Sequence, residues 1–162
     1  MEQQNLSKIV ESVVNTLMEH SAASCMTLSL AQALTQKVLT RAKEIGVNAV
    51  VAVSNAGARP VSVTCMDGSF IASYDVALQK AYTVVALKMS TIDLKPLAQP
   101  GGPLYGIQFT NQGQIVVFGG GEPLKVGEEV IGGLGVSGGT EEQDTALAAY
   151  GRQVFEEMRP WQ

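Results

Sequence analysis

Glycine is concentrated in two short clusters near the C-terminal end of the chain, Gly119-Gly120-Gly121 and Ser137-Gly138-Gly139. The second cluster stands directly before a predicted helix that begins at Thr140. The first N–H groups of a helix have no partner within the helix and lie at the positive end of its dipole, so they can hold a carboxylate or a phosphate. The sequence therefore predicts an anion-binding turn at residues 137–139. A tight strand-to-helix turn, capped by Thr140, is the open alternative.

Charged and amide side chains could complete such a site. Gln143 and Asp144 follow the turn in the predicted helix, where they either line the site or satisfy local amides. Lys80 lies in the middle of another predicted helix, near its apolar stripe. It pairs with Asp67 or Asp144 across a cleft, or it extends into solvent as most helical lysines do. The ligand-binding candidates are Asp67, Lys80, Gly119, Gly120, Gly121, Ser137, Gly138, Gly139, Gln143 and Asp144.

The chain has one histidine, His20, and two cysteines, Cys25 and Cys65. Ser-His-Asp and Cys-His sites need a histidine beside the nucleophile, and zinc sites need closely spaced His and Cys ligands. The sequence therefore predicts no catalytic triad and no metal site. The glycine clusters are not a P-loop, because no Gly-Lys-Ser/Thr follows them. The letters G-x-G-x-x-G occur at residues 133–138, but they lie in an apolar stretch typical of a strand, so they are weak evidence of a nucleotide site.

The composition is that of a single globular domain, with 162 residues, 46% hydrophobic residues and a formal net charge of -4. Such a charge does not favour nucleic-acid binding. No apolar run reaches the roughly 20 residues of a membrane-spanning helix. The acidic, amide-rich N-terminus is unlike a secretory signal. We therefore expect a cytoplasmic protein with free thiols.

An amphipathic helix is predicted at residues 5–20, followed by small residues at 21–24 that have the composition of a linker. Its apolar stripe consists of Leu6, Ile9, Val10, Val13, Val14 and Leu17. We divide the chain into this helix and linker, residues 1–24, and a main domain, residues 25–162. The helix either packs on the domain and mediates oligomer contacts, or docks into a groove of a partner protein.

The main domain alternates helical and strand patterns. Helices are predicted at residues 27–46, 69–88 and 140–158, and strands at 47–53, 61–66, 107–110, 115–118 and beside the second glycine cluster. Ser29 and Gln32 have the spacing of a capping box at the first of these helices. The Pro- and Gly-rich residues 90–103 are expected to form a lid-like loop. This order predicts an α+β fold with an antiparallel sheet of about five strands.

Five motifs follow one another in the main domain: Met66-Asp67-Gly68, Lys80-Ala81-Tyr82-Thr83, Gly119-Gly120-Gly121-Glu122-Pro123-Leu124, Ile131-Gly132-Gly133-Leu134-Gly135-Val136-Ser137-Gly138-Gly139 and Gln143-Asp144. Over about residues 26–158, their order and spacing resemble the GlcG/HbpS family, which includes the C-terminal domain of PduO-type corrinoid adenosyltransferases. The resemblance implies a profilin-like three-layer sandwich with helices on both faces of the sheet, and homo-oligomers from dimers up to octamers. It also implies a ligand such as heme, a corrinoid or a small organic acid.

Two positions depart from the pattern of that family. Asn55-Ala56-Gly57 stands where the family often has Asp-x-Gly-Gly, and Cys65 stands where it often has Arg. No family heme ligand can be carried over to this chain. His20, with Met18 and Cys25 nearby, is the remaining heme-ligand candidate. The alternative is a packed or solvated histidine near a helix end.

Three functions are compatible with these residues. The leading one is a non-catalytic oligomeric accessory protein that holds heme, a corrinoid or a small organic acid in diol, glycerol or glycolate metabolism, as the resemblance implies. The second is a structural protein docked through residues 5–20 to a partner enzyme or to the shell of a bacterial microcompartment, whose cargo helices have a similar pattern. The third is an enzyme that acts on a small organic acid through Lys80 and Asp67. It ranks last because no nucleophile–base pair is present.

Overall fold

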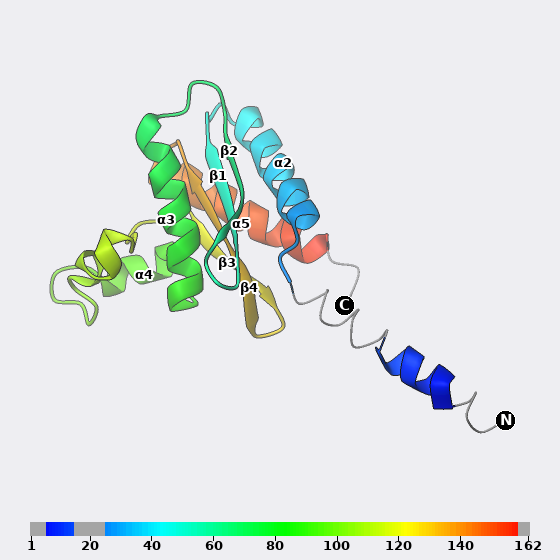
Figure 1. Ribbon diagram of the computed structural model, residues 1–162. Coiled ribbons are helices and arrows are strands. Elements are labelled where there is room, and N and C mark those ends of the chain that lie inside the picture. The colour runs from blue at the N-terminus through cyan, green and yellow to red at the C-terminus, as the bar shows by residue number, and fades with distance from the viewer. Residues whose placement is uncertain (1–5, 15–24, 159–162) are drawn as a thin grey trace.

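The structure, a computed structural model, describes residues 6–14 and 25–158. Its body is a four-stranded antiparallel sheet with helices on both faces (Figure 1). Helix α3 (Ile71–Leu87) covers one face, while α2 (Leu28–Glu44) and α5 (Glu141–Glu157) lie together on the other. The predicted α+β three-layer sandwich is confirmed.

The strands lie in the order β2 (Pro60–Cys65), β1 (Val50–Asn55), β4 (Glu129–Ser137) and β3 (Gly121–Val126). Two hairpins, β1–β2 and β3–β4, are joined by pairing between the central strands, in which Val50 lies opposite Ser137. The continuous Val and Ala run of β1 predicts a strand buried on both faces. The structure agrees, because residues 50–54 are all buried.

The hydrophobic core is divided unequally by the sheet. The larger part lies between the sheet and the pair α2 and α5, and includes Leu34, Val38, Val51, Val53, Leu134, Val136, Leu147 and Phe155. The smaller part lies beneath α3 and consists of Val50, Ala52, Ala77 and Ala81. Because side chains alternate along a strand, neighbouring residues of β1 enter different parts of the core.

Glycines of β4 allow α3 to lie directly on the sheet. A Cβ atom would be 2.4 Å from the carbonyl oxygen of Ala81 if added at Gly133, and 2.0 Å from that of Ala77 if added at Gly135. Real Cβ atoms do not approach backbone oxygens so closely. The neighbouring Leu134 and Val136 point to the opposite face and enter the larger core. The glycine-rich motif therefore brings one backbone against another.

The predicted hairpin at residues 107–118 is wrong. This segment forms two short 3-10 turns, Ile107–Phe109 and Asn111–Gly113, and the sheet has four strands where about five were expected. Local backbone hydrogen bonds take the place of those that paired strands would make. One example is the hydrogen bond from the Phe109 amide to the Gly106 oxygen (3.0 Å). The φ angles are positive at Gly106, Asn111 and Gln112, whereas regular strands have negative φ angles.

Two predicted helix starts and one loop can be compared with the structure. The capping box of Ser29 and Gln32 is wrong, because α2 begins earlier, with Thr27 as N-cap and its Oγ1 accepting from the Leu30 amide at 3.2 Å. Thr140 caps α5 as predicted. The loop at residues 90–103 contains a short helix, α4 (Thr91–Leu97), capped by Ser90.

The N-terminal helix can be followed only over residues 6–14, which are helical. Five residues of the predicted apolar stripe are exposed: Leu6, Ile9, Val10, Val13 and Val14. The rest of this prediction, including Leu17, His20 and the linker at 21–24, lies outside the described residues, and the domain boundary stays a prediction. No described helix is long and apolar enough to cross a membrane.

Candidate functional site

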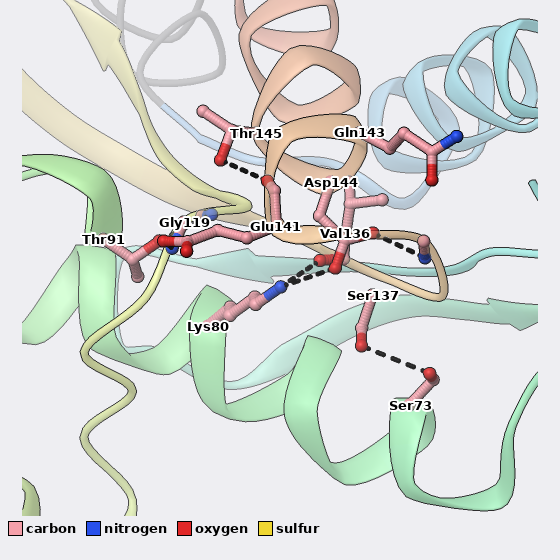
Figure 2. A network of polar contacts seen from close by, with 12 residues as sticks. Ser73, Lys80, Thr91, Gly119, Val136, Ser137, Glu141, Gln143, Asp144 and Thr145 are labelled. Atoms are coloured by element: carbon pink, nitrogen blue, oxygen red, sulfur yellow. Dashed lines mark hydrogen bonds and ion pairs between the residues drawn. The ribbon is translucent and has the colours of Figure 1, made fainter. Parts of the chain in front are cut away.

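Lys80 is the most unusual of the predicted site residues, because its side chain is fully buried. It projects from α3 toward the start of α5 (Figure 2). Its Nζ atom lies 3.0 Å from Oδ2 of Asp144 and donates a 2.7 Å hydrogen bond to the Val136 carbonyl oxygen. The ammonium also lies 4.9 Å from the centre of the Phe118 ring. One cation thus joins α3, β4 and α5.

Asp144 is held in place by the turn that precedes its helix. Its second oxygen, Oδ1, accepts a 2.9 Å hydrogen bond from the Gly139 amide, and only 5% of its side chain is exposed. Gly120 makes room for the pair, because a Cβ atom there would be 2.5 Å from the Lys80 Nζ, and its φ of 109° suits glycine. The glycine cluster at 119–121 therefore packs around a buried ion pair.

Burial controls the electrostatics of this pair. Loss of solvation lowers the pKa of Lys80 from its ordinary value, and the nearby Asp144 carboxylate only partly opposes that effect. Two of the three ammonium donors are already taken by protein oxygens. Of the two partners predicted for Lys80, the structure selects Asp144. The arrangement is that of an internal cross-link.

The predicted anion site at residues 137–139 already has a carboxylate from the chain. Asp144 accepts from the Gly139 amide, and Gln143 Oε1 accepts from the Thr140 amide at 2.9 Å. In return, Thr140 Oγ1 accepts from the Gln143 amide, which completes a capping box. Ser137 Oγ lies 3.2 Å from Ser73 Oγ. Anion binding by these residues stays a prediction, and the geometry gives them a structural role.

The other glycine cluster is bound by side chains in the same way. The Gly119 amide donates to Glu141 Oε1 at 2.9 Å, and the Gly121 amide donates to Thr91 Oγ1 at 2.9 Å. The hydrogen bond from Gly119 and the ion pair with Lys95 lower the pKa of Glu141. These contacts fasten β3 to the first turns of α4 and α5.

Asp67 is not part of this group. It is exposed in the connection between β2 and α3, before α3 begins at Ile71. Lys80 lies nine residues into that helix, about 14 Å along its axis. The enzyme hypothesis joined Asp67 to Lys80, but the structure buries one and exposes the other. The described residues contain no group of three or more His, Cys, Asp and Glu side chains that could hold a metal ion.

Sequence reasoning missed a cavity of about 590 Å³ on the α3 side of the molecule. Three segments line it: the β1–β2 turn (residues 57–60), one face of α3 (Leu78, Gln79 and Tyr82) and the 3-10 segment (Asn111, Gln112 and Gln114). Its volume falls within the range of small-molecule sites. No local pattern could reveal it, because its walls come from distant parts of the sequence. We call it the turn–helix cavity.

The chain is similar to several proteins over the main domain. A family model described as "Haem degrading protein HbpS-like" matches residues 26–153. An uncharacterised 15.0 kDa protein of the dhaT-dhaS intergenic region in Citrobacter freundii is 43% identical, covering 82% of this chain and 94% of that protein. The corrinoid adenosyltransferase PduO of Salmonella typhimurium is 39% identical over 71% of this chain, which spans only 34% of PduO.

Solved structures give the same result. ORFY of Klebsiella pneumoniae has a TM-score of 0.80 and 41% identity, covering 82% of this chain and 92% of ORFY. A complex of PduOC with heme has a TM-score of 0.77 and 35% identity, covering 80% of this chain and 94% of PduOC. A double mutant of HbpS from Streptomyces reticuli shares the fold. It has a TM-score of 0.73 and 24% identity, covering 80% of this chain and 86% of that one. The chain therefore belongs to the HbpS-like family.

Proposed function

We propose that the protein is a non-catalytic accessory protein that binds heme. The observation that carries this proposal is its 35% identity to PduOC, which was solved as a heme complex and is covered over 94% of its length. A corrinoid is the next ligand to consider, because PduO is a corrinoid adenosyltransferase. A role in diol, glycerol or glycolate metabolism would follow from the same kinship.

The described residues of one chain offer no nitrogen ligand of the kind that most often binds heme iron. They include no histidine, because the single one of the chain is His20. Half of the ten residues that line the turn–helix cavity are amides or an arginine, and none of the ten is a histidine, cysteine or methionine that could bind iron. We propose His20 as the iron ligand, with Met18 and Cys25 as the other candidates.

Heme titration of the full-length protein tests this proposal. Wild type should show a saturable shift of the Soret band, and His20→Ala should lose the shift or move it to another position. Lys8→Ala, a change of another polar residue of the same N-terminal segment, is the matched control and should bind as wild type does. Wild type with no Soret shift would remove heme as the ligand, while an unchanged spectrum of His20→Ala would remove His20.

We also propose that the chain forms homo-oligomers between a dimer and an octamer. Phe70, Ile71 and Tyr74 are all exposed at the start of α3, with Ile71 at 94%. Neighbouring apolar side chains of this kind are typical of protein contact sites. Light scattering after size-exclusion chromatography should give an oligomer mass, which Ile71→Glu should reduce. A monomeric wild type would contradict this proposal.

A second function is docking through the N-terminal helix, in a bacterial cytoplasm or within a microcompartment. The observation that favours it is the exposure of Leu6, Ile9, Val10, Val13 and Val14, at 43–62% each. Deleting residues 1–20 should leave the fold and the oligomer intact but abolish co-purification with a partner enzyme or shell protein. If the oligomer dissociates instead, the helix is an assembly element. The enzyme hypothesis gains no support, because Lys80 is buried and already paired.

A further inference from the structure

We propose that the turn–helix cavity binds a small hydroxylated molecule through its carboxylate group, at a site separate from any heme. The first argument is charge. Arg59 lines the cavity, and its guanidinium makes no ion pair or hydrogen bond within the part of the chain that the structure describes. Arg41 and Arg152, by contrast, pair with glutamates. The residues that line the cavity include no Asp or Glu, so the cation of Arg59 has no internal counter-charge.

The backbone that carries Arg59 is fixed. Asn55 Oδ1 accepts hydrogen bonds from the amides of Gly57 (2.9 Å) and Arg59 (3.1 Å), and the Asn55 amide donates to the Arg59 oxygen at 2.9 Å. An asparagine side chain that closes its own turn holds the following residues in one conformation. The backbone of Arg59 is therefore held in a fixed turn, and its exposed side chain lines the cavity.

The opposite wall is fixed by a buried hydroxyl group. Thr83 lies on α3, fully buried, and its Oγ1 accepts from the Val116 amide at 3.0 Å. The same hydroxyl lies 3.3 Å from the Gln114 oxygen. These contacts tie the end of the 3-10 segment to the helix, so that Asn111, Gln112 and Gln114 stay above the face of α3 that lines the cavity.

The polar groups of the cavity indicate the kind of ligand. Tyr82 Oη accepts from Asn111 Nδ2 at 3.2 Å, which leaves its own hydrogen free to donate. The amide groups of Gln79, Gln112 and Gln114 can each donate and accept, as hydroxyl groups of a ligand require. A guanidinium can pair bidentately with a carboxylate or a phosphate, and the single positive charge of this cavity is balanced most closely by the single negative charge of a carboxylate. The ligand class is therefore a hydroxylated monocarboxylate.

Backbone conformation gives an argument that does not depend on charge. Four non-glycine residues of the described part have positive φ, and three of them, Ala58, Asn111 and Gln112, line this cavity. Such conformations cost energy and are concentrated at ligand sites, where the surrounding structure maintains them. In this chain they meet from two segments more than 50 residues apart in the sequence.

Three probes test the proposal by NMR titration of the isotope-labelled full-length chain: gluconate, its neutral counterpart sorbitol, and inorganic phosphate. Gluconate should shift the amides of Arg59, Tyr82 and Asn111 saturably, and the other two probes should not. Arg59→Met should weaken gluconate binding about tenfold or more, as expected for loss of a hydrogen-bonded charge. Arg41→Met makes the same change of charge on α2 and should leave the affinity unchanged.

Each other result overturns the proposal. Absence of a saturable shift with gluconate removes the site, and equal binding of sorbitol removes the carboxylate as the recognised group. Stronger binding of phosphate makes it a phosphate site. An affinity that survives Arg59→Met shows that the cation does not contribute. Because heme is measured by its Soret band, failure here and failure of heme binding are separate results.

Discussion

Replacing Lys80 by methionine tests whether the buried ion pair holds the sandwich together. Lys80→Met keeps an unbranched side chain in the same space and removes only the charged end. Asp144 then retains its hydrogen bond from the Gly139 amide but loses its cation, with 5% of its side chain exposed. The Val136 carbonyl oxygen loses a donor as well. A negative charge is left in the interior without compensation.

The expected cost follows from these contacts. Removing one member of a buried ion pair destabilises a protein by about 3–5 kcal/mol, a large part of the roughly 5–15 kcal/mol by which a domain is stable. The double variant Lys80→Met with Asp144→Asn should recover more than half of this loss. Asparagine still offers an oxygen to the Gly139 amide, and no charge remains buried.

Urea denaturation followed by far-ultraviolet circular dichroism, at one fixed protein concentration, measures these differences. Lys95→Met is the matched control, because Lys95 also pairs with a carboxylate in the first turn of α5, Glu141, but the two side chains are 43% and 26% exposed. Its loss should cost less than about 1 kcal/mol. The reasoning fails if Lys80→Met costs no more than this control, or if the double variant is no more stable than Lys80→Met.

Two further predictions concern the sheet. Gly135→Ala should destabilise the protein by about 3 kcal/mol, the upper range for overpacking, because the added Cβ meets the Ala77 oxygen. Gly57→Ala is the control. Its Cβ would meet only a side-chain oxygen at 3.3 Å, so it should cost less than about 1 kcal/mol. Equal urea midpoints for the two would contradict the close contact with α3. Burial raises the pKa of Glu122 in the folded protein, despite its ion pair with Arg152. This residue therefore contributes stability at pH values below its unfolded pKa of 4.5, and that stability is lost as pH rises through the pKa of the folded state. Glu122→Gln should therefore be more stable than wild type at pH 7 and no more stable at pH 4. A urea midpoint below that of wild type at pH 7 would refute this.

The sequence predicted those parts of the fold that local patterns determine. The Val- and Ala-rich run at residues 47–53 indicated a central strand, which the structure has at Val50–Asn55. Thr140 indicated the start of α5, which is confirmed. The segment at 107–118 has the hydrophobicity of a hairpin, yet it folds into turns in which Asn111 and Gln112 adopt left-handed conformations. Residue type alone does not determine which non-glycine positions adopt positive φ.

For the candidate site as well, residue types alone do not determine which groups contact one another. Lys80 and Asp144 could be selected from the sequence because both are chemically active, but whether they face a ligand or each other depends on how α3 and α5 meet. The glycine-rich motif at residues 131–139 carried the family resemblance, and the structure shows that two of its glycines, Gly133 and Gly135, lie against the backbone of α3. Arg59 could not be selected from the sequence, because lone arginines in turns are common and only the structure shows that this one lines a cavity.

Pairing of β1 with β4 also has a consequence for the kinetics of folding. The two hairpins are local, but the central pair joins Val50 to Ser137 and encloses α3, α4 and the 3-10 turns in one large loop. Closing such a loop loses chain entropy before any contact compensates for it, which slows folding. Three glycines weaken β4 as an independent strand, and α3 covers two of them. We expect the rate-limiting step to be the docking of the β3–β4 hairpin onto β1 and α3, so that the amino-terminal half of the domain acts as a template for the rest.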